Sequence, residues 1–268
     1  MSNESALSNK VASELVSEFV ADESTFENVS EKFSSELLIS AQKKTWALVR
    51  ELASELAAGW TEEQAQKEMD VMFAREGAEK KWHPSKIRFG VNSTKSFREL
   101  SEPGVVLKEN DIFFIDIGSV FFGHEADCGQ TFVLKDNQLF SVKSEADAIW
   151  AEQSDYYKLK LASEKLFSIV ANKWKNENEE NENEKDEKKN KLSGVELYEY
   201  AAIEAEKMGY QLNLQGAGGH RIGDFPHAVF HKGALNQFKQ KPQEQRWILE
   251  IQLRHPQLAV GAFFEDVL

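Results

Sequence analysis

The sequence has little cysteine, no excess of basic residues and no long apolar run. Cys128 is the single cysteine in 268 residues, which excludes an intrachain disulfide and fits a reducing compartment. Lysine and arginine number 32 against 45 aspartates and glutamates, so the net charge is −13. Because general nucleic-acid binding needs a basic face, this balance argues against a nucleic-acid partner.

The absence of a long apolar run bears on location. No stretch approaches the roughly 20 apolar residues of a membrane span, and the N-terminus has no apolar run that could serve as a signal peptide. We therefore expect a cytoplasmic protein with no membrane partner. With 41% hydrophobic residues, the chain is long enough for one large core of helices and strands.

Acidic residues inside apolar strands are the most informative feature that the sequence does have. Residues 112–118 are apolar apart from Asp116, and 130–134 are mostly apolar, so both are predicted strands of a hairpin with its turn at 122–124. Asp127 follows Asp116 by eleven residues. Two buried carboxylates that face each other are costly unless a cation neutralises them. From the hairpin alone, two unrelated acids that cap turns remain an equal alternative.

Three more residues with metal-binding side chains follow. His220 comes directly after a glycine-rich stretch, which lets the backbone approach a site closely, although a lone histidine there is more often structural. Glu250 interrupts the apolar stretch WILEIQL, and Glu265 interrupts GAFFEDVL. Together with the two aspartates they make a set of four carboxylates and one imidazole, which suits two divalent ions such as Mn, Co, Fe or Zn.

The order Asp, Asp, His, Glu, Glu resembles a known family. The DIG tripeptide at 116–118, the seven-residue spacing from His220 to His227 and the closing FFED at 263–266 strengthen the resemblance, which covers about residues 40–268. The family is that of methionine aminopeptidase, aminopeptidase P and prolidase, the M24 metallopeptidases. It implies the α+β pita-bread fold, in which two pseudo-symmetric αβ halves surround a central antiparallel sheet.

The resemblance also implies roles for individual residues. Asp116 would bind one ion alone, Asp127 and Glu265 would bridge both ions, and His220 and Glu250 would complete the second. A hydroxide between the ions would attack a peptide carbonyl, Glu250 would shuttle its proton, and His227 would bond the carbonyl or oxyanion. An imidazole that only stabilises the turn beside Pro226 is the alternative for His227. The substrate would be a peptide, cleaved after its first residue or at a Xaa-Pro bond, and the assembly state, a homodimer included, stays open.

One departure from the family concerns substrate handling. Relatives carry another histidine shortly before the DIG strand, but no histidine lies between His83 and Asp116. We expect that Arg98 or another group replaces it, or that the substrate is held differently. The stretch KKWHPSKIRFGVNS holds four candidates for lining the cleft: Trp82, His83, Arg88 and Asn92. Packing by Trp82 is at least as good an explanation, and no catalytic role is assigned here.

The expected domain organisation is simple. Residues 1–39 are predicted to be a mobile or weakly helical extension, and 40–268 a single catalytic domain. A charged, low-complexity insertion at about 174–192 cannot bury apolar surface. Helices are predicted at 41–58 and after Thr61, which is a candidate N-cap, and again before Gly209, a candidate C-cap.

Two other classes of function remain open. One is a metal-free or inactive binding module with the same fold, although such proteins generally lose ligand residues and all five are present here. The other is a metal-independent hydrolase of a small amidine or amide, as in the creatinase relatives, which lack the carboxylate cluster.

Overall fold

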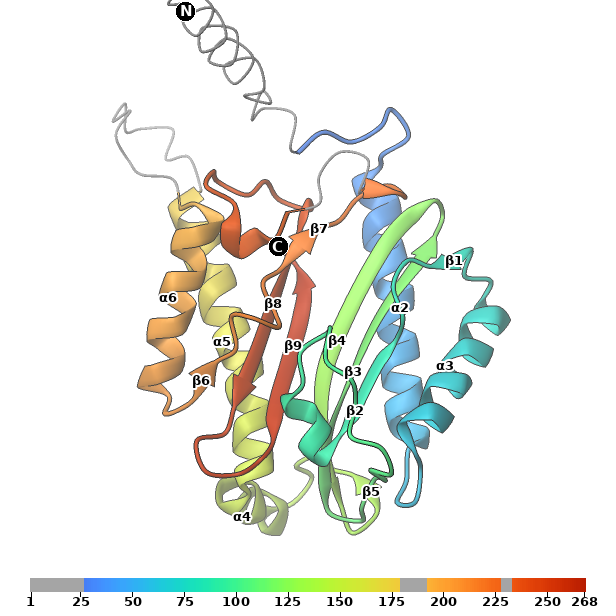
Figure 1. Ribbon diagram of the computed structural model, residues 1–268, viewed down its shortest axis with the longest axis vertical. Helices are drawn as coiled ribbons and strands as arrows, with labels where there is room; N and C mark the ends of the chain where they lie inside the picture. Colours follow the sequence, from blue (N-terminus) through green and yellow to red (C-terminus); the bar gives the residue numbers. More distant parts are fainter. Residues whose placement is uncertain (1–26, 179–191, 228–232) are drawn as a thin grey trace, which may run out of the picture.

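The structure, a computed structural model, describes residues 27–178, 192–227 and 233–268 (Figure 1). Most of the predicted extension 1–39 and of the charged insertion at about 174–192 therefore lies outside the described residues. Helix α2 already begins at Ser35, five residues before the expected start of the domain. The proposed domain boundaries stay a prediction.

Nine described strands form one antiparallel sheet with the central order β3-β4-β9-β8. The strands are β1 (Lys80–Lys81), β2 (Lys86–Phe89), β3 (Asp111–Phe121), β4 (His124–Lys135), β5 (Gln138–Leu139), β6 (Gln211–Leu212), β7 (His220–Arg221), β8 (Trp247–Arg254) and β9 (Gly261–Val267). The short strands β1, β2 and β7 add to the long central ones, since β1 and β2 pair with β3, and β7 pairs with β8.

The helices divide the molecule into two halves. The α-helices are α2 (Ser35–Glu55), α3 (Glu62–Glu76), α4 (Glu145–Gln153), α5 (Asp155–Asn178) and α6 (Gly194–Lys207), and the 3-10 helices are η2 (Gly90–Thr94) and η4 (Leu235–Gln237). One hydrophobic core joins α2 and α3 to β3 and β4, and a second joins α5 and α6 to β8 and β9. Figure 1 shows these two helix pairs on either side of the strands, the arrangement that the family resemblance implies.

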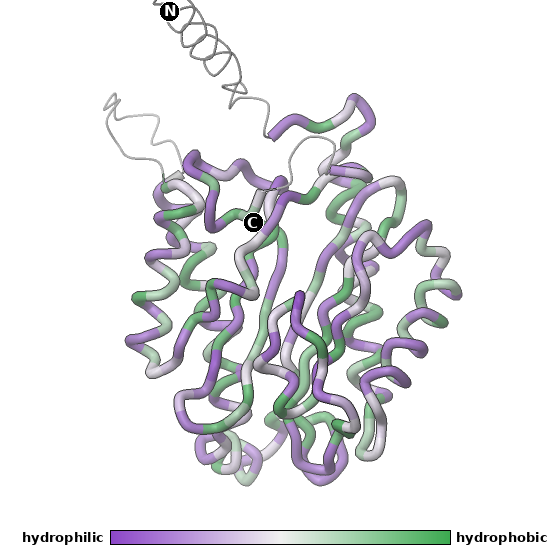
Figure 2. Tube along the Cα trace, in the orientation of Figure 1, coloured by the Kyte–Doolittle hydropathy of each residue, from purple (hydrophilic) through white to green (hydrophobic). Residues whose placement is uncertain are grey.

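Local sequence signals account for the helix ends. Thr61 is the N-cap of α3, and with Gln64 it forms a capping box, while Gly77 ends the helix in a left-handed conformation with φ 71°. Gly209, with φ 81°, follows the C-cap residue of α6. Hydrophobic and hydrophilic residues alternate along the helices, as surface helices require (Figure 2). No helix within the described ranges is long and apolar enough to cross a membrane.

The predicted hairpin is the β3–β4 pair. Its turn consists of Phe122 and Gly123, both with positive φ, the conformation of a tight two-residue turn. His124, which we expected in the turn, instead pairs with Phe121 as the first residue of β4. Ile115 and Ile117 pack in the core with α2, so Asp116, which alternates with them, points to the opposite face of the sheet.

Candidate metal centre

The sheet register lines up three acidic residues from three strands. Asp116 on β3 lies opposite Gly129 on β4, Gly129 lies opposite Glu265 on β9, and Glu265 lies opposite Glu250 on β8. Residues that are directly opposite in antiparallel strands point to the same face. The register alone therefore brings Asp116, Glu265 and Glu250 together on the face opposite the helices.

Asp127 completes the set of carboxylates one step along the sheet. It lies opposite Gly118, and its side chain is buried. The Nε2 atom of His220, on the short strand β7, is 2.9 Å from Asp127 Oδ2 and 3.7 Å from Glu250 Oε1. The structure thus brings the five predicted ligand residues to one place.

A second imidazole, which the sequence analysis considered only for lining the cleft, also reaches this place. His83, in the connection between β1 and β2, has its Nε2 atom 3.0 Å from Asp127 Oδ1 and 3.7 Å from Asp116 Oδ1. β1 and β2 both pair with β3, and the connection between them carries His83 over Gly118 of β3, an arrangement that the letters alone do not indicate. Arg98, one of the groups considered in place of the missing family histidine, lines a neighbouring pocket.

Two glycines leave the space that these side chains fill. A Cβ atom at Gly118 would lie 2.0 Å from Cδ2 of His83. At Gly129 it would lie 2.7 Å from Oε1 of Glu265 and 2.5 Å from Cε1 of Phe263. Since real Cβ atoms do not come so close to other heavy atoms, any larger residue at either position has to displace part of the site.

Burial and mutual repulsion dominate the electrostatics. Burial raises the pKa of Asp116 to about 7, and Asp127 and Glu250 add to the rise by repulsion. Burial likewise raises the pKa values of Glu250 and Glu265. At Asp127 burial acts in the same direction, but the neighbouring imidazoles of His83 and His220 outweigh it and lower the pKa to about 2.

The two imidazoles respond in the opposite sense. Burial alone would lower the pKa values of His83 and His220, but the carboxylate of Asp127 outweighs it and raises both to about 9. Without other cations the cluster has to hold extra protons, because four carboxylates share the space with only two imidazoles. Such a site attracts cations.

The donor set fits divalent metal ions. Oε1 of Glu265 is buried and has no hydrogen-bond partner among the described residues. Two groups of side chains bring one potential ligand atom each to within 4.8 Å of one another: His83, Asp116, Asp127 and Asp127, His220, Glu265. Carboxylate oxygens with imidazole nitrogens and no thiolate suit Mn, Co, Fe or Zn.

His227, the predicted second catalytic residue, lies beside the cluster. Its ring is 6.3 Å from that of His220 and 5.6 Å from that of Trp82, measured between centroids. Its Nδ1 atom and its backbone N–H both bond the carboxylate of Glu125, a buried residue on β4. Glu125 was not identified from the sequence. It holds the His227 ring in a fixed orientation.

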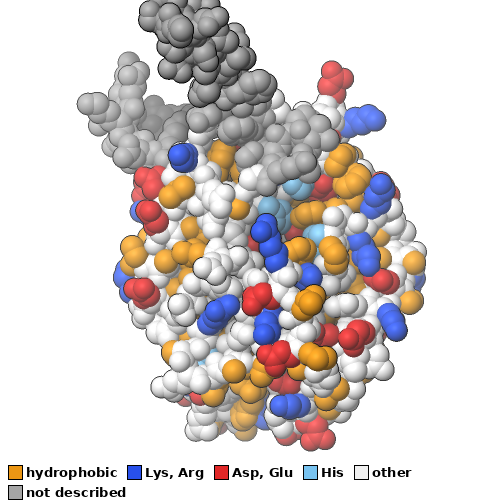
Figure 3. All heavy atoms as spheres, in the orientation of Figure 1, with side chains coloured by type: hydrophobic (Ala, Val, Ile, Leu, Met, Phe, Trp, Pro, Cys, Tyr) orange, Lys and Arg blue, Asp and Glu red, His pale blue; other side chains and the backbone are white. Residues whose placement is uncertain are grey.

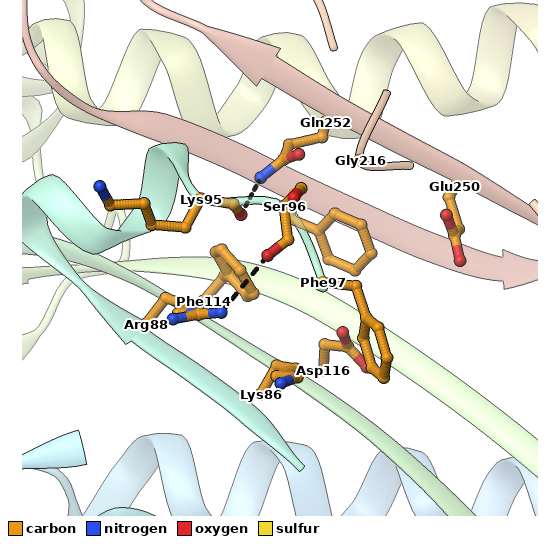
Figure 4. Close-up of a pocket in the computed structure, with 11 residues that line it drawn as sticks. Lys86, Arg88, Lys95, Ser96, Phe97, Phe114, Asp116, Gly216, Glu250 and Gln252 are labelled. Atoms are coloured by element: carbon orange, nitrogen blue, oxygen red, sulfur yellow. Dashed lines mark hydrogen bonds between the residues drawn. The ribbon is translucent and has the colours of Figure 1, made fainter. Parts of the chain in front are cut away.

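A small pocket opens next to the carboxylates. Asp116 and Glu250 lie on its walls, and Figure 4 shows the ring of Phe97 beside Asp116. Lys86, which pairs with Asp116 across β2 and β3, places its Nζ 4.6 Å from the centre of the Phe97 ring. Histidine side chains reach the surface on this face of the molecule, among hydrophobic, lysine and arginine side chains (Figure 3).

Solved structures with the same fold confirm the predicted α+β pita-bread architecture. An X-Pro aminopeptidase from Thermotoga maritima has a TM-score of 0.61 at 17% identity, with 92% of this chain and 61% of that chain covered. A prolidase from Pyrococcus furiosus has a TM-score of 0.59 at 16% identity, with 90% of this chain and 61% of that one covered. A methionine aminopeptidase from Thermotoga maritima has a TM-score of 0.59 at 12% identity, with 87% of this chain and 90% of that chain covered.

The fold and the cluster together define a class of protein. It consists of pita-bread proteins in which carboxylates and imidazoles form one cluster that could hold metal ions. The sequence model of metallopeptidase family M24 matches residues 36–167, a segment that contains Asp116 and Asp127. Over that segment the chain is similar to metallopeptidase family M24. No curated protein sequence matches it. The chain spans about three fifths of the length of the X-Pro aminopeptidase and of the prolidase, 61% in each case.

Proposed function

We propose that the protein is a dinuclear metallopeptidase that hydrolyses a peptide bond near the N-terminus of a short peptide. The observation that carries the proposal is the register of β3, β4, β9 and β8, which places Asp116, Glu265 and Glu250 side by side next to Asp127. The three buried carboxylates and the half-buried Glu250 carry a charge of −4 when ionised, and two divalent ions balance it. A binding module has no need to maintain such a costly cluster.

The side chains divide into three groups by position. Asp116 lies at one end of the cluster, Glu250 and His220 lie at the other, and Asp127 and Glu265 lie between them. The residues in the middle would hold both ions, and those at each end would hold one ion. Divalent ions held there supply Lewis acidity and a water nucleophile near neutral pH.

Glu250 is the proposed general acid and base. Burial raises the pKa of its carboxyl group, a shift in the direction that favours proton uptake by a general base. The backbone N–H of Gly219 donates to Glu250 Oε2 over 3.2 Å, which fixes the side chain. A carboxylate in this position can take a proton from water and pass it to the leaving amine.

His227 is proposed to bond the substrate carbonyl. An ionised Glu125 carboxylate only accepts hydrogen bonds, so Nδ1 of His227 carries the hydrogen of that contact. The other ring nitrogen, Nε2, is then free of that contact and available to a substrate. Glu125 is a positioning residue in this scheme, because it acts through His227.

The proposed substrate class is a short peptide. The similar structures include enzymes named X-Pro aminopeptidase and methionine aminopeptidase, and the pocket next to the carboxylates is lined by Asp116 and Glu250 of the cluster. Lys86 lines this pocket and can attract a negatively charged group of the peptide. Burial lowers the pKa of Lys86, and the nearby Arg88 adds to this, whereas Asp116 acts in the opposite direction.

The test combines metal content with peptide cleavage. Protein purified without chelator is expected to hold two divalent ions per chain, and protein supplied with Co²⁺ or Mn²⁺ is expected to cleave dipeptides or Xaa-Pro peptides from a library. Glu250→Gln should retain the fold and lose turnover by about 100-fold to 10,000-fold, the usual contribution of a general acid or base. Glu244→Gln, at an exposed residue with the same change in charge, is the matched control.

Two results would contradict the proposal. One is peptide cleavage that survives in Glu250→Gln at the wild-type rate. The other is a chain that binds no divalent ion even after exposure to Co²⁺ and Mn²⁺, which would favour the metal-free binding module or the metal-independent hydrolase.

A further inference from the structure

Two imidazoles flank Asp127, one on each oxygen of its carboxylate. His83 Nε2 is 3.0 Å from Oδ1, and His220 Nε2 is 2.9 Å from Oδ2. Each imidazole also has a second carboxylate at 3.7 Å, which is Asp116 for His83 and Glu250 for His220. The two ends of the cluster therefore offer the same donors at closely similar distances.

The hydrogen bonds behind the two rings are also the same. Nδ1 of His83 is 3.0 Å from the carbonyl oxygen of Pro84, and Nδ1 of His220 is 2.7 Å from that of Arg221, so each ring bonds the backbone of the next residue. A carbonyl oxygen only accepts hydrogen bonds, hence Nδ1 carries a hydrogen in both rings. The neutral form of each ring then presents the lone pair of Nε2 to the carboxylates, which is the tautomer of a metal ligand whose other nitrogen is held by a backbone carbonyl.

We infer that His83 is a sixth ligand of the metal centre and binds the ion that Asp116 holds. Each ion would then have one imidazole, one carboxylate of its own and the shared carboxylates of Asp127 and Glu265. The inference rests on the proposed dinuclear site and goes beyond its five ligands, in which one ion has only carboxylates.

The packing around His83 keeps the ring in this position. Trp82, whose ring meets that of His83 edge to face at 4.5 Å, donates from Nε1 to the carbonyl oxygen of Ala126 over 3.0 Å. Phe97 covers another side of the ring, with 5.6 Å between centroids. Gly118 leaves the volume that the ring occupies, since a Cβ there would lie 2.2 Å from Nε2. The side chain is 9% exposed, so the site has little room for the ring to turn away.

The chemical consequence concerns the two ions. Carboxylate-only sites suit Mg and Mn, whereas imidazole adds preference for Zn, Co and Fe. With an imidazole at each end, both ions are expected to be bound with comparable affinity and with the same preference among metals.

The experiment titrates chelator-treated protein with Co²⁺ and follows binding by calorimetry. The wild type is expected to bind two ions with similar affinity. In His83→Ala the affinity for one ion should stay unchanged, and the affinity for the other should fall at least about 100-fold. Even residues that only orient a metal ligand change metal affinity roughly 10- to 100-fold. His220→Ala should give the mirror result at the other end. His255→Ala, which removes an imidazole from a turn outside the site, should leave both affinities unchanged.

A second measurement counts nitrogen ligands directly. X-ray absorption of the two-cobalt protein should show one imidazole per ion on average in the wild type and half that number in the His83 variant. His83→Gln, which keeps a side chain that can hydrogen-bond to the carboxylates, replaces His83→Ala if the alanine variant does not fold, and it should lose the same ion.

The outcomes separate this inference from the proposed function. Two tightly bound ions and an unchanged imidazole count in both His83 variants, with a raised KM for peptide, would overturn the inference in favour of substrate binding and leave the dinuclear site standing. A wild type that binds no Co²⁺ would overturn both.

Discussion

The two halves of the sheet supply the candidate metal centre in different ways. The N-terminal half gives Asp116 and Asp127 from one continuous hairpin, and the C-terminal half gives Glu250 and Glu265 from the neighbouring strands β8 and β9. Each half adds one imidazole from a short segment at its edge: His83 comes from the connection before β2, and His220 from a strand of two residues.

This comparison separates two physical tasks. Long paired strands fix the carboxylates, because a register shift of one residue would turn every acid to the helix side and bury it in an apolar core. The imidazoles have no such constraint, and their positions depend on packing and backbone hydrogen bonds, as at Pro84 and Arg221. Substitution of the acids should therefore cost the most activity. Substitution of each imidazole should show whether the two halves bind their metal ions equally.

Asp127→Asn is expected to have the largest effect, because this side chain joins the halves. Both imidazoles contact its carboxylate, and an amide neither neutralises two ions nor bridges them as well. We expect metal-dependent peptide cleavage to fall by about 1,000-fold or more, within the range that metal ions and positioned groups contribute. Calorimetric titration with Co²⁺ should show both affinities reduced. Loss of a single ion would mean that Asp127 belongs to one half only.

The sequence identified the acids as ligands, but it did not identify the second imidazole as one. Asp116 and Glu250 stand out because a carboxylate interrupts an apolar strand, and that signal depends only on neighbouring letters. His83 lies in a connection between strands, where a histidine is unremarkable, and its role depends on the pairing of Lys86 with Asp116. Glu125 was missed for a similar reason, since its partner His227 is 102 residues away.

Glu125→Gln tests a contact between the halves, since Glu125 is on β4 and His227 follows β7. An amide keeps one hydrogen bond but holds no negative charge, so the His227 ring is less firmly oriented. Peptide turnover is expected to fall by roughly 10- to 100-fold, the usual effect of losing a partner that orients a functional histidine. Measurements of kcat at a series of pH values should show a changed pH profile, while the affinity for Co²⁺ should change little. An equal loss of metal binding would show that Glu125 supports the centre and not His227.

Gly118→Ala and Gly129→Ala compare the two ends at the level of packing. The added methyl group meets His83 at the first position and Glu265 and Phe263 at the second. Each variant is expected to lose about 1–3 kcal/mol of stability from overpacking, measured by urea unfolding of the metal-free protein. Gly118→Ala should lower the affinity for one Co²⁺ ion. Gly129→Ala should lower the affinity for both ions, because it displaces Glu265.

The control for this pair is Gly223→Ala. A Cβ at Gly223 would be 3.7 Å from Val29, an ordinary contact, so stability and Co²⁺ binding should stay near the wild-type values. If Gly118→Ala also leaves both ions tightly bound, the ring of His83 is free to move and its proposed place at the centre is wrong.

The pH dependence of the metal-free protein gives the smallest expected effect and compares the imidazoles directly. In the folded state the pKa of Asp116 is raised to about 7 and those of His83 and His220 to about 9, from ordinary values of 3.8 and 6.5. The folded state therefore binds more protons than the unfolded state, and stability should fall as pH rises from about 4 through about 9. The lowered pKa of Asp127 contributes in the opposite sense, with stability that is present above pH 4 and lost toward pH 2.

Melting temperatures of chelator-treated protein at several pH values would show this fall, and Co²⁺ should reduce it because the ions replace the protons. His83→Ala and His220→Ala should each remove a similar part of this fall in stability between about pH 6.5 and pH 9. The reason is that the carboxylate of Asp127 stabilises the protonated form of both imidazoles. If only His220→Ala alters that interval, His83 carries no charge in the metal-free protein. The two ends of the centre would then differ in the charge of their imidazoles, although their matched geometry predicts the same charge at both.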